Sequence, residues 1–187
     1  LDAMGVLKMS VEAVQRRNDT RAWGELEFVA MVTPDVPESY YAPIEKMGYR
    51  VKIVPNPVEI ADIQNEQLRK DIMKDGAMGI TEMVKIDVFR WTEYHRVLLV
   101  DGAALALRNF DELFEMESFF GWTHGVWAGE HMNGGFFVVD PNRDGAKHYD
   151  NVVEIFKEGD WRLGNSSSGS GWRGSRVGYV YGGMTLQ

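Results

Sequence analysis

The chain has 187 residues, 44% of them hydrophobic, which suits one folded domain with a substantial core and argues against a disordered chain. Its 28 acidic residues outnumber its 20 Lys and Arg residues, so no large positive surface is available for a phosphate backbone and nucleic acid is not an expected partner. No apolar run reaches the roughly 18 to 20 residues that cross a bilayer, so no membrane span is expected in this segment. The absence of cysteine excludes disulfides and thiol catalysis but leaves the compartment undecided between cytoplasm and Golgi lumen.

The first third of the chain contains two predicted helices and two predicted strands. LDAMGVLKMSVEAVQRR has apolar residues at helical spacing. LEFVAMVT at 26–33 is typical of a buried strand, and PESYYAPIEKMG predicts a short helix closed by Gly48. YRVKIVPNP then predicts a strand over 50–54 that its prolines end. Because no strand precedes the first helix and GGMTLQ closes no obvious element, we expect a segment that is incomplete at both ends.

The remaining predicted elements continue the alternation. Helical patterns cover 59–75 and 81–94, RVLLVD predicts a strand over 97–101, MNGGFFVVDP predicts another over 134–139, and a helix is expected near 145–158. This order predicts an α/β domain spanning 1–187, with all four strands in one mainly parallel sheet and 97–101 at its centre.

The stretch GNSSSGSGWRGSRVGYVYGG at 164–183 is rich in Gly and Ser. Such composition is typical of a flexible surface loop, although its Trp and Tyr residues also suit a loop folded over a site. Residues 169–174 fit the GxGxxG dinucleotide pattern, yet no strand precedes them and no helix follows. An NAD-dependent oxidoreductase is therefore the poorest interpretation.

Asp101 directly follows the apolar run RVLLV. Ligands of open α/β sheets bind beyond the carboxyl ends of the strands, and a carboxylate there can hold Mg²⁺ or Mn²⁺. The alternative is a turn aspartate that bonds its own backbone beside Gly102. Downstream, Asn109 is a predicted helix N-cap, which makes Asp111 and Glu112 helix-start charges.

Lys85 and the glycine pair before the strand at 134–139 are further candidates. Lys85 lies at the margin of a helical pattern, where a lysine is either a solvated charge or a contact for an anionic ligand. Asn133 with Gly134 and Gly135 could approach a sugar closely, but glycines at such a place also mark β-bulges. The four histidines show no metal-ligand spacing.

Several of these segments together resemble glycosyltransferase family 8, the glycogenin-like and galactinol-synthase-like enzymes. The similarity lies in GVLKMSVEAV, VKIDVFRWTEYHRVLLVDGAALALRNFDELFE, MNGGFFVVDP and GWRGSRVGYVYGGMTLQ. It implies a GT-A type fold, a Rossmann-like sandwich with a mixed, mainly parallel central sheet. It also implies a retaining hexosyltransferase that moves sugar from a UDP-sugar donor to a carbohydrate or other hydroxyl acceptor.

The family carries an Asp-x-Asp motif whose two carboxylates bind Mn²⁺ at the donor diphosphate. Here the motif reads Asp101-Gly102-Ala103, so the resemblance carries over Asp101 as the first metal ligand and loses the second. The family's histidine ligand would lie beyond Gln187. The implied Mn²⁺ site is therefore weakened by Ala103.

The resemblance also assigns the donor-binding residues. Lys85 matches the donor-binding lysine, and Asn133 matches the sugar-contacting asparagine of an Asn-x-Gly strand that includes Gly134 and Gly135. Leu186-Gln187 aligns with an Asp-Gln pair, so Gln187 is carried over as a donor contact. No catalytic nucleophile is implied. The rival interpretation, favoured by Ala103, is a non-catalytic nucleotide-sugar-binding or interaction module that keeps the fold.

Overall fold

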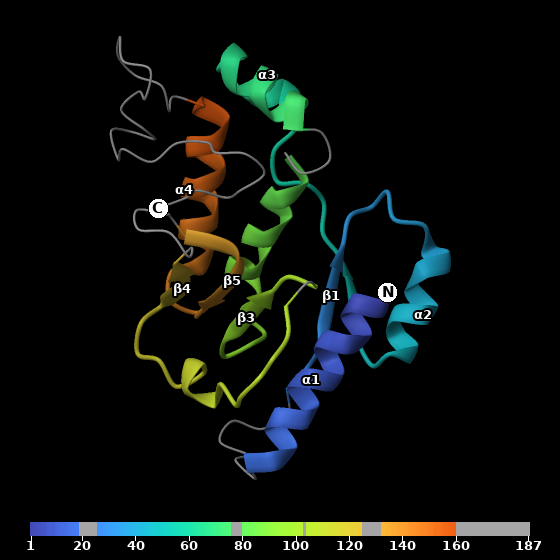
Figure 1. Cartoon of the computed structure of the whole chain (residues 1–187). Coiled ribbons are helices and arrows are strands. Elements are labelled where there is room, and N and C mark those ends of the chain that lie inside the picture. The colour runs from blue at the N-terminus through green and yellow to red at the C-terminus, as the bar shows by residue number, and fades with distance from the viewer. Residues whose placement is uncertain (19–25, 76–79, 103, 125–131, 160–187) are drawn as a thin grey trace. The chain divides into compact units, whose positions relative to one another are not determined.

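The computed structural model describes residues 1–18, 26–75, 80–102, 104–124 and 132–159 (Figure 1). These residues form a mixed α/β structure of helices and two small sheets, which confirms the predicted class at this level. They fall into two compact units, Leu1–Pro55 with Val100–Glu117, and Asn56–Leu99 with the described residues from 118 onward. The prediction of one domain over 1–187 stays a prediction. None of the described helices is long and apolar enough to cross a membrane.

The described residues of the first unit form two α-helices, two short 3₁₀ helices and a two-stranded sheet. Its elements are α1 (Asp2–Asn18), β1 (Val29–Val32), η1 (Glu38–Tyr40), α2 (Tyr41–Lys46), β2 (Arg50–Ile53) and η5 (Asp111–Leu113). The strands pair in parallel, with Val29 opposite Arg50 and Val32 opposite Ile53. Parallel strands need a crossover connection, and η1 and α2 supply it.

The core of this unit lies between the sheet and its helices. Ala30, Val32, Ile44 and Tyr49 are buried together, and Met4 of α1 packs against them. The Tyr49 hydroxyl donates a 2.8 Å hydrogen bond to the Met4 carbonyl, so the aromatic ring is buried while its polar end is satisfied. The predicted helix stop is confirmed, because Gly48 follows α2 with φ of 84°, a conformation that favours glycine.

The second unit contains a three-stranded sheet covered by helices. Its elements are η2 (Ile60–Asp62), α3 (Glu66–Asp75), η4 (Ile80–Arg90), β4 (Phe120–His124), β5 (Met132–Val139) and α4 (Gly145–Glu158), together with β3 (Val97–Val100), within which the boundary between the units falls. The strand order is β3-β5-β4. β4 and β5 are antiparallel, with Phe120 opposite Val139.

Aromatic packing joins this sheet to η4. The ring of Phe89 stacks on Phe120 of β4 at 5.7 Å and on Phe137 of β5 at 6.4 Å between centroids. Phe137 is fully buried. α4 approaches the same part of η4, since a Cβ placed on Gly145 would lie only 2.0 Å from the Phe89 carbonyl oxygen. The glycine at the start of α4 therefore permits the close contact of these two helices.

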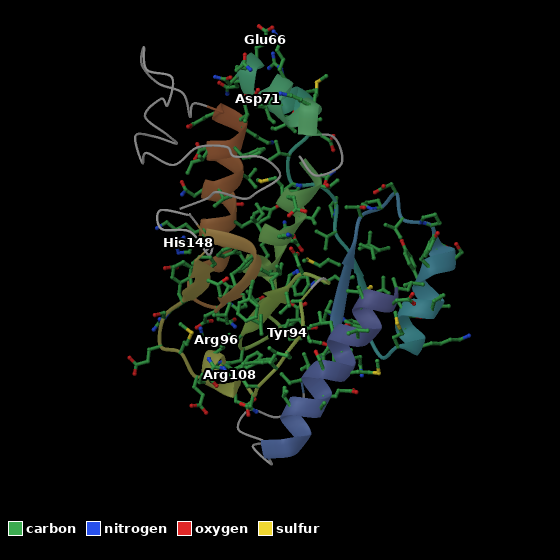
Figure 2. The ribbon with its side chains drawn as sticks, viewed as in Figure 1. Glu66, Asp71, Tyr94, Arg96, Arg108 and His148 are labelled. Atoms are coloured by element: carbon green, nitrogen blue, oxygen red, sulfur yellow. The ribbon has the colours of Figure 1, made fainter. Side chains whose placement is uncertain are left out.

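Arg96, whose side chain is only 5% exposed, connects the strand ends of this sheet. Arg96 precedes β3, donates a 2.7 Å hydrogen bond to the carbonyl of Ser118 before β4, and pairs with Asp140 after β5 at 3.8 Å. Nearby, His148 of α4 stacks on Phe119 with centroids 4.4 Å apart. Figure 2 labels both Arg96 and His148. Arg96 thus helps to hold the three strands together at one end.

The prediction that 26–33, 50–54, 97–101 and 134–139 share one sheet is wrong for the described residues. β1 and β2 form one sheet, whereas β3 and β5 belong to another. β3 is also an edge strand of its sheet rather than the central one, because β5 lies between β3 and β4. The described pairings are mixed, parallel in the first sheet and antiparallel between β4 and β5.

The predicted helices are largely confirmed in position. α4 at Gly145–Glu158 covers the predicted range. The pattern at 59–75 divides into η2 and α3, because the Asn65 side chain accepts a 2.9 Å hydrogen bond from the Leu68 N–H and caps α3. The pattern at 81–94 becomes η4, which is a 3₁₀ helix that ends at Arg90.

Candidate functional site

Asp101 lies in an exposed turn directly after β3. Its backbone carbonyl accepts a 3.0 Å hydrogen bond from the Ala104 N–H, so the turn is closed by the backbone. Gly102 is exposed, and a Cβ placed on it would meet no atom within 4 Å. A side chain at Gly102 would therefore extend into open space.

The segment that leaves this turn is attached to α1 and to a short helix. The Ser10 hydroxyl oxygen accepts a 3.0 Å hydrogen bond from the Ala106 N–H. Further on, the Asn109 side chain accepts from the Asp111 N–H at 2.8 Å and donates to the Asp111 carboxylate at 2.9 Å. Asp111 and Glu112 lie in the first turn of η5, as predicted. The prediction that Asn109 is the N-cap is wrong, because Phe110 occupies that position and Asn109 bonds the Asp111 N–H from one residue earlier.

Lys85 lies on η4 in the second unit and differs from a solvated surface charge. Its side chain is 12% exposed and its Nζ lies 2.5 Å from Oε2 of Glu82, whose side chain is 24% exposed. Sequence reasoning selected Lys85 but missed Glu82. The available signal was the Glu-x-x-Lys spacing, which brings two side chains together on a helix.

Gly134 and Gly135 lie within β5 and are half-buried. The pairing of β4 with β5 is irregular here, since Trp122 lies opposite Phe137 whereas His124 lies opposite Met132. Between these two pairs, one residue of β4 therefore lies opposite four residues of β5, an irregularity larger than the single extra residue of a β-bulge. This supports the structural interpretation of the glycine pair.

Other predicted residues lie outside the described part of the chain. These are Ala103, Gln187, the loop at 164–183 with its GxGxxG match, and the side chain of Asn133. Of the remaining candidates, Asp101 and Gly102 belong to the first unit, and Lys85, Gly134 and Gly135 belong to the second. The expectation that they converge on one donor-binding cleft stays a prediction.

The donor set around Asp101 is incomplete for a manganese ion by itself. Mn²⁺ is commonly six-coordinate with oxygen-rich ligands, and one carboxylate supplies at most two oxygens. Among the described residues, no group of three or more His, Asp or Glu side chains is suited to hold a metal. A manganese ion held by Asp101 would therefore need phosphate and water oxygens to complete its coordination.

Comparisons with known proteins give weak but consistent relationships. No family model matches the chain. It is 25% identical to glycogenin-1 of Oryctolagus cuniculus over 158 residues, which cover 83% of this chain and 42% of the relative. It is 26% identical to glycogenin-1 of Mus musculus over 176 residues, covering 91% of this chain and 48% of the relative. Galactinol synthase 7 of Arabidopsis thaliana is 29% identical over 98 residues, covering 52% and 26% respectively.

The chain therefore spans less than half the length of each of these relatives. The two protein names agree with the family that the sequence resembles, although they come from matches of low identity. On these similarities, the chain shows weak homology to glycogenin-1 and to a galactinol synthase, which supports a glycogenin-like family of glycosyltransferases.

Proposed function

We propose that this chain forms the donor-binding part of a retaining glycosyltransferase that transfers a hexose from a UDP-sugar to a hydroxyl acceptor, with a weakened metal site. The observation that carries the proposal is the exposed turn of Asp101 and Gly102 directly after β3. In this chain the turn lies within the segment that most resembles family 8. The similarity to glycogenin-1 and galactinol synthase supports the same assignment.

The proposed roles follow from the charge of the donor. Transfer of the hexose leaves a nucleoside diphosphate, so negative charge develops on the diphosphate oxygens. Lys85 would bind these oxygens through its ammonium group. Asp101 would share a Mn²⁺ ion with the diphosphate, and this ion would supply neutralisation of the developing charge. Asn133, Gly134, Gly135 and Gln187 would contact the sugar side of the donor.

A second function is a nucleotide-sugar-binding or interaction module without transferase activity. Ala103 favours it, because the second carboxylate of the metal motif is replaced by a methyl group. The transferase and a nucleotide-sugar-binding module both predict that UDP binds, and they differ in whether a UDP-hexose is consumed, by transfer or by hydrolysis, when it is incubated with the protein and Mn²⁺. A pure interaction module predicts no UDP binding.

Calorimetric titration of UDP with and without Mn²⁺ tests the shared part of the proposal. We expect Asp101→Asn to reduce the dependence of UDP affinity on Mn²⁺. The matched control is Asp35→Asn, which removes the same charge from another exposed turn of the first unit. Absence of UDP binding in the unmodified protein contradicts the proposal, as does an Asp101→Asn variant that behaves like the control.

A further inference from the structure

The ion pair between Glu82 and Lys85 is the feature of η4 that the proposed function leaves unexplained. η4 is a 3₁₀ helix over Ile80–Arg90. Such a helix has three residues per turn, so side chains three positions apart lie directly above one another. Glu82 and Lys85 have this spacing, and their charged atoms are 2.5 Å apart. The backbone geometry therefore directs the carboxylate at the ammonium group.

Burial separates this pair from an ordinary surface ion pair. Glu66 and Lys70 of α3 have a similar separation of 2.6 Å, but their side chains are 70% and 63% exposed. Figure 2 shows Glu66 at one end of α3. The Glu82 and Lys85 side chains are only 24% and 12% exposed. Water and salt screen an exposed pair strongly and a largely buried pair much less.

The helix backbone that carries the pair is held in place by its buried neighbours. Met83 and Ile86, which follow Glu82 and Lys85 in the chain, are buried in the core of the second unit. They anchor η4 on the side next to the pair. Glu82 consequently stays within reach of Lys85 while the helix stays packed.

We propose that Glu82 is an internal competitor for the donor diphosphate at Lys85, and that it sets the donor affinity. This rests on the proposed role of Lys85 as a donor-phosphate contact. The Glu82 carboxylate and a phosphate oxygen of the donor would both accept hydrogen bonds from the Lys85 ammonium group. A diphosphate that binds Lys85 must therefore break its ion pair with Glu82, and the cost of breaking that pair lowers the affinity for an anionic donor.

The test uses calorimetry to compare the UDP affinities of variants in which a glutamate carboxylate is replaced by an uncharged amide. Glu82→Gln keeps nearly the same shape and still offers an oxygen that accepts a hydrogen bond from Lys85, but it removes the negative charge. We expect UDP to bind about three- to tenfold more tightly, and the gain to shrink as salt is added. Glu66→Gln is the matched control, because it makes the same change of net charge at the exposed pair and should leave UDP affinity unchanged.

A double variant tests whether the gain in UDP affinity depends on Lys85. In the Lys85→Gln background, Glu82→Gln should produce no gain, because the ammonium group for which the two anions compete is gone. If Glu82→Gln lowers the folded fraction in thermal unfolding, Glu82→Ser removes the same charge with a smaller side chain, and the same gain is expected.

The outcomes separate this inference from the proposed function. An unmodified protein that binds UDP, with a Glu82→Gln variant that binds it equally or more weakly, overturns the competitor role and leaves the proposed function standing. A gain that persists without Lys85 also overturns it. Failure of every form to bind UDP contradicts the proposed function itself, and the competitor role fails with it.

Discussion

The indole Nε1 of Trp91 donates a 2.8 Å hydrogen bond to Oδ2 of Asp87, and both residues are buried. The other carboxylate oxygen accepts from Nε of Arg90 at 3.0 Å, and Arg90 also contacts it through Nη2. The Arg90 guanidinium lies over the ring of Tyr149 in α4, 4.0 Å from its centroid. Asp87 therefore connects the end of η4 both to the core and, through Arg90, to α4.

This arrangement predicts that Asp87→Ala destabilises the protein by about 2 to 4 kcal/mol, because it leaves a buried indole N–H without its acceptor and removes the partner of Arg90. Urea unfolding followed by circular dichroism measures the change. The matched control is Asp35→Ala in an exposed turn, which should change the free energy of unfolding by less than about 0.5 kcal/mol. Equal effects of the two substitutions would contradict the role assigned to Asp87.

Substitution by alanine should have opposite effects at Gly145 and at Gly5, because only Gly145 lies at the contact between α4 and η4. Gly145→Ala would place a methyl group 2.0 Å from the Phe89 carbonyl oxygen, so the helices must separate, at a cost of about 1 to 3 kcal/mol. Gly5→Ala in α1 places its methyl group 3.6 Å from the Met47 sulfur, an ordinary contact, and should stabilise the protein by about 0.5 to 1 kcal/mol. Thermal unfolding of both variants checks the signs, and a neutral Gly145→Ala would show that the close approach is absent.

The buried phenol of Tyr49 predicts a loss of stability at alkaline pH. Burial, and to a smaller extent the negative charge of Glu12, raises the pKa of Tyr49 above its ordinary value of 10.0. A group whose pKa is raised by folding contributes stability that is complete below the unfolded-state pKa and is lost as pH rises through the folded-state pKa. We therefore expect the free energy of unfolding to fall as pH rises above about 10.

Tyr49→Phe isolates this contribution. At neutral pH it should destabilise the protein by about 1 kcal/mol, because the Met4 carbonyl loses its hydrogen bond. The difference between the variant and the unmodified protein should narrow above about pH 10, since the variant has no phenol to ionise. Denaturant unfolding across this pH range measures both effects, with Tyr40→Phe at an exposed position as the control. A constant difference at all pH values would exclude the phenol as its source.

The sequence predicted the positions of the strands and helices better than it predicted which strands pair with one another. The apolar runs at β1, β3 and β5 indicate strands with buried side chains. The sequence of β2 alternates, and none of its four residues is buried. The same runs do not specify partners, so the separation into two sheets was not predicted. β4 was missed because FGWTH contains a glycine and a histidine and lacks clear alternation. Its pairing with β5 makes β5, rather than β3, the middle strand of that sheet.

For the candidate site, the sequence identified residue types better than their environments. It placed Asp101 after a strand, and the structure confirms that position. It could not show that Lys85 is largely buried and paired with Glu82, because exposure depends on how η4 packs against the rest of its unit. The same holds for Arg96, whose partners Ser118 and Asp140 are 22 and 44 residues further along the chain.

Ala103 provides the last prediction, which separates a weakened transferase from an interaction module. With one carboxylate, binding of Mn²⁺ alone should be weak, because water and the donor diphosphate must supply most of the coordination. Ala103→Asp restores the second acid of the motif. We expect it to strengthen Mn²⁺-dependent UDP binding by about 1 to 3 kcal/mol, as a charge-assisted contact would.

Calorimetric titration of UDP with and without Mn²⁺, on both forms, measures this change. Ala103→Asn is the matched control, since it adds a side chain of the same size without the charge and should gain much less. If the unmodified protein binds UDP tightly only with Mn²⁺ and consumes a UDP-hexose, the metal site is not weakened and Ala103 has no consequence for it. If the unmodified protein and Ala103→Asp both leave UDP unbound, the nucleotide-sugar assignment fails, because restoring the second carboxylate should strengthen any donor site built around Asp101. An interaction module would then be the better account of the Asp101-Gly102-Ala103 turn.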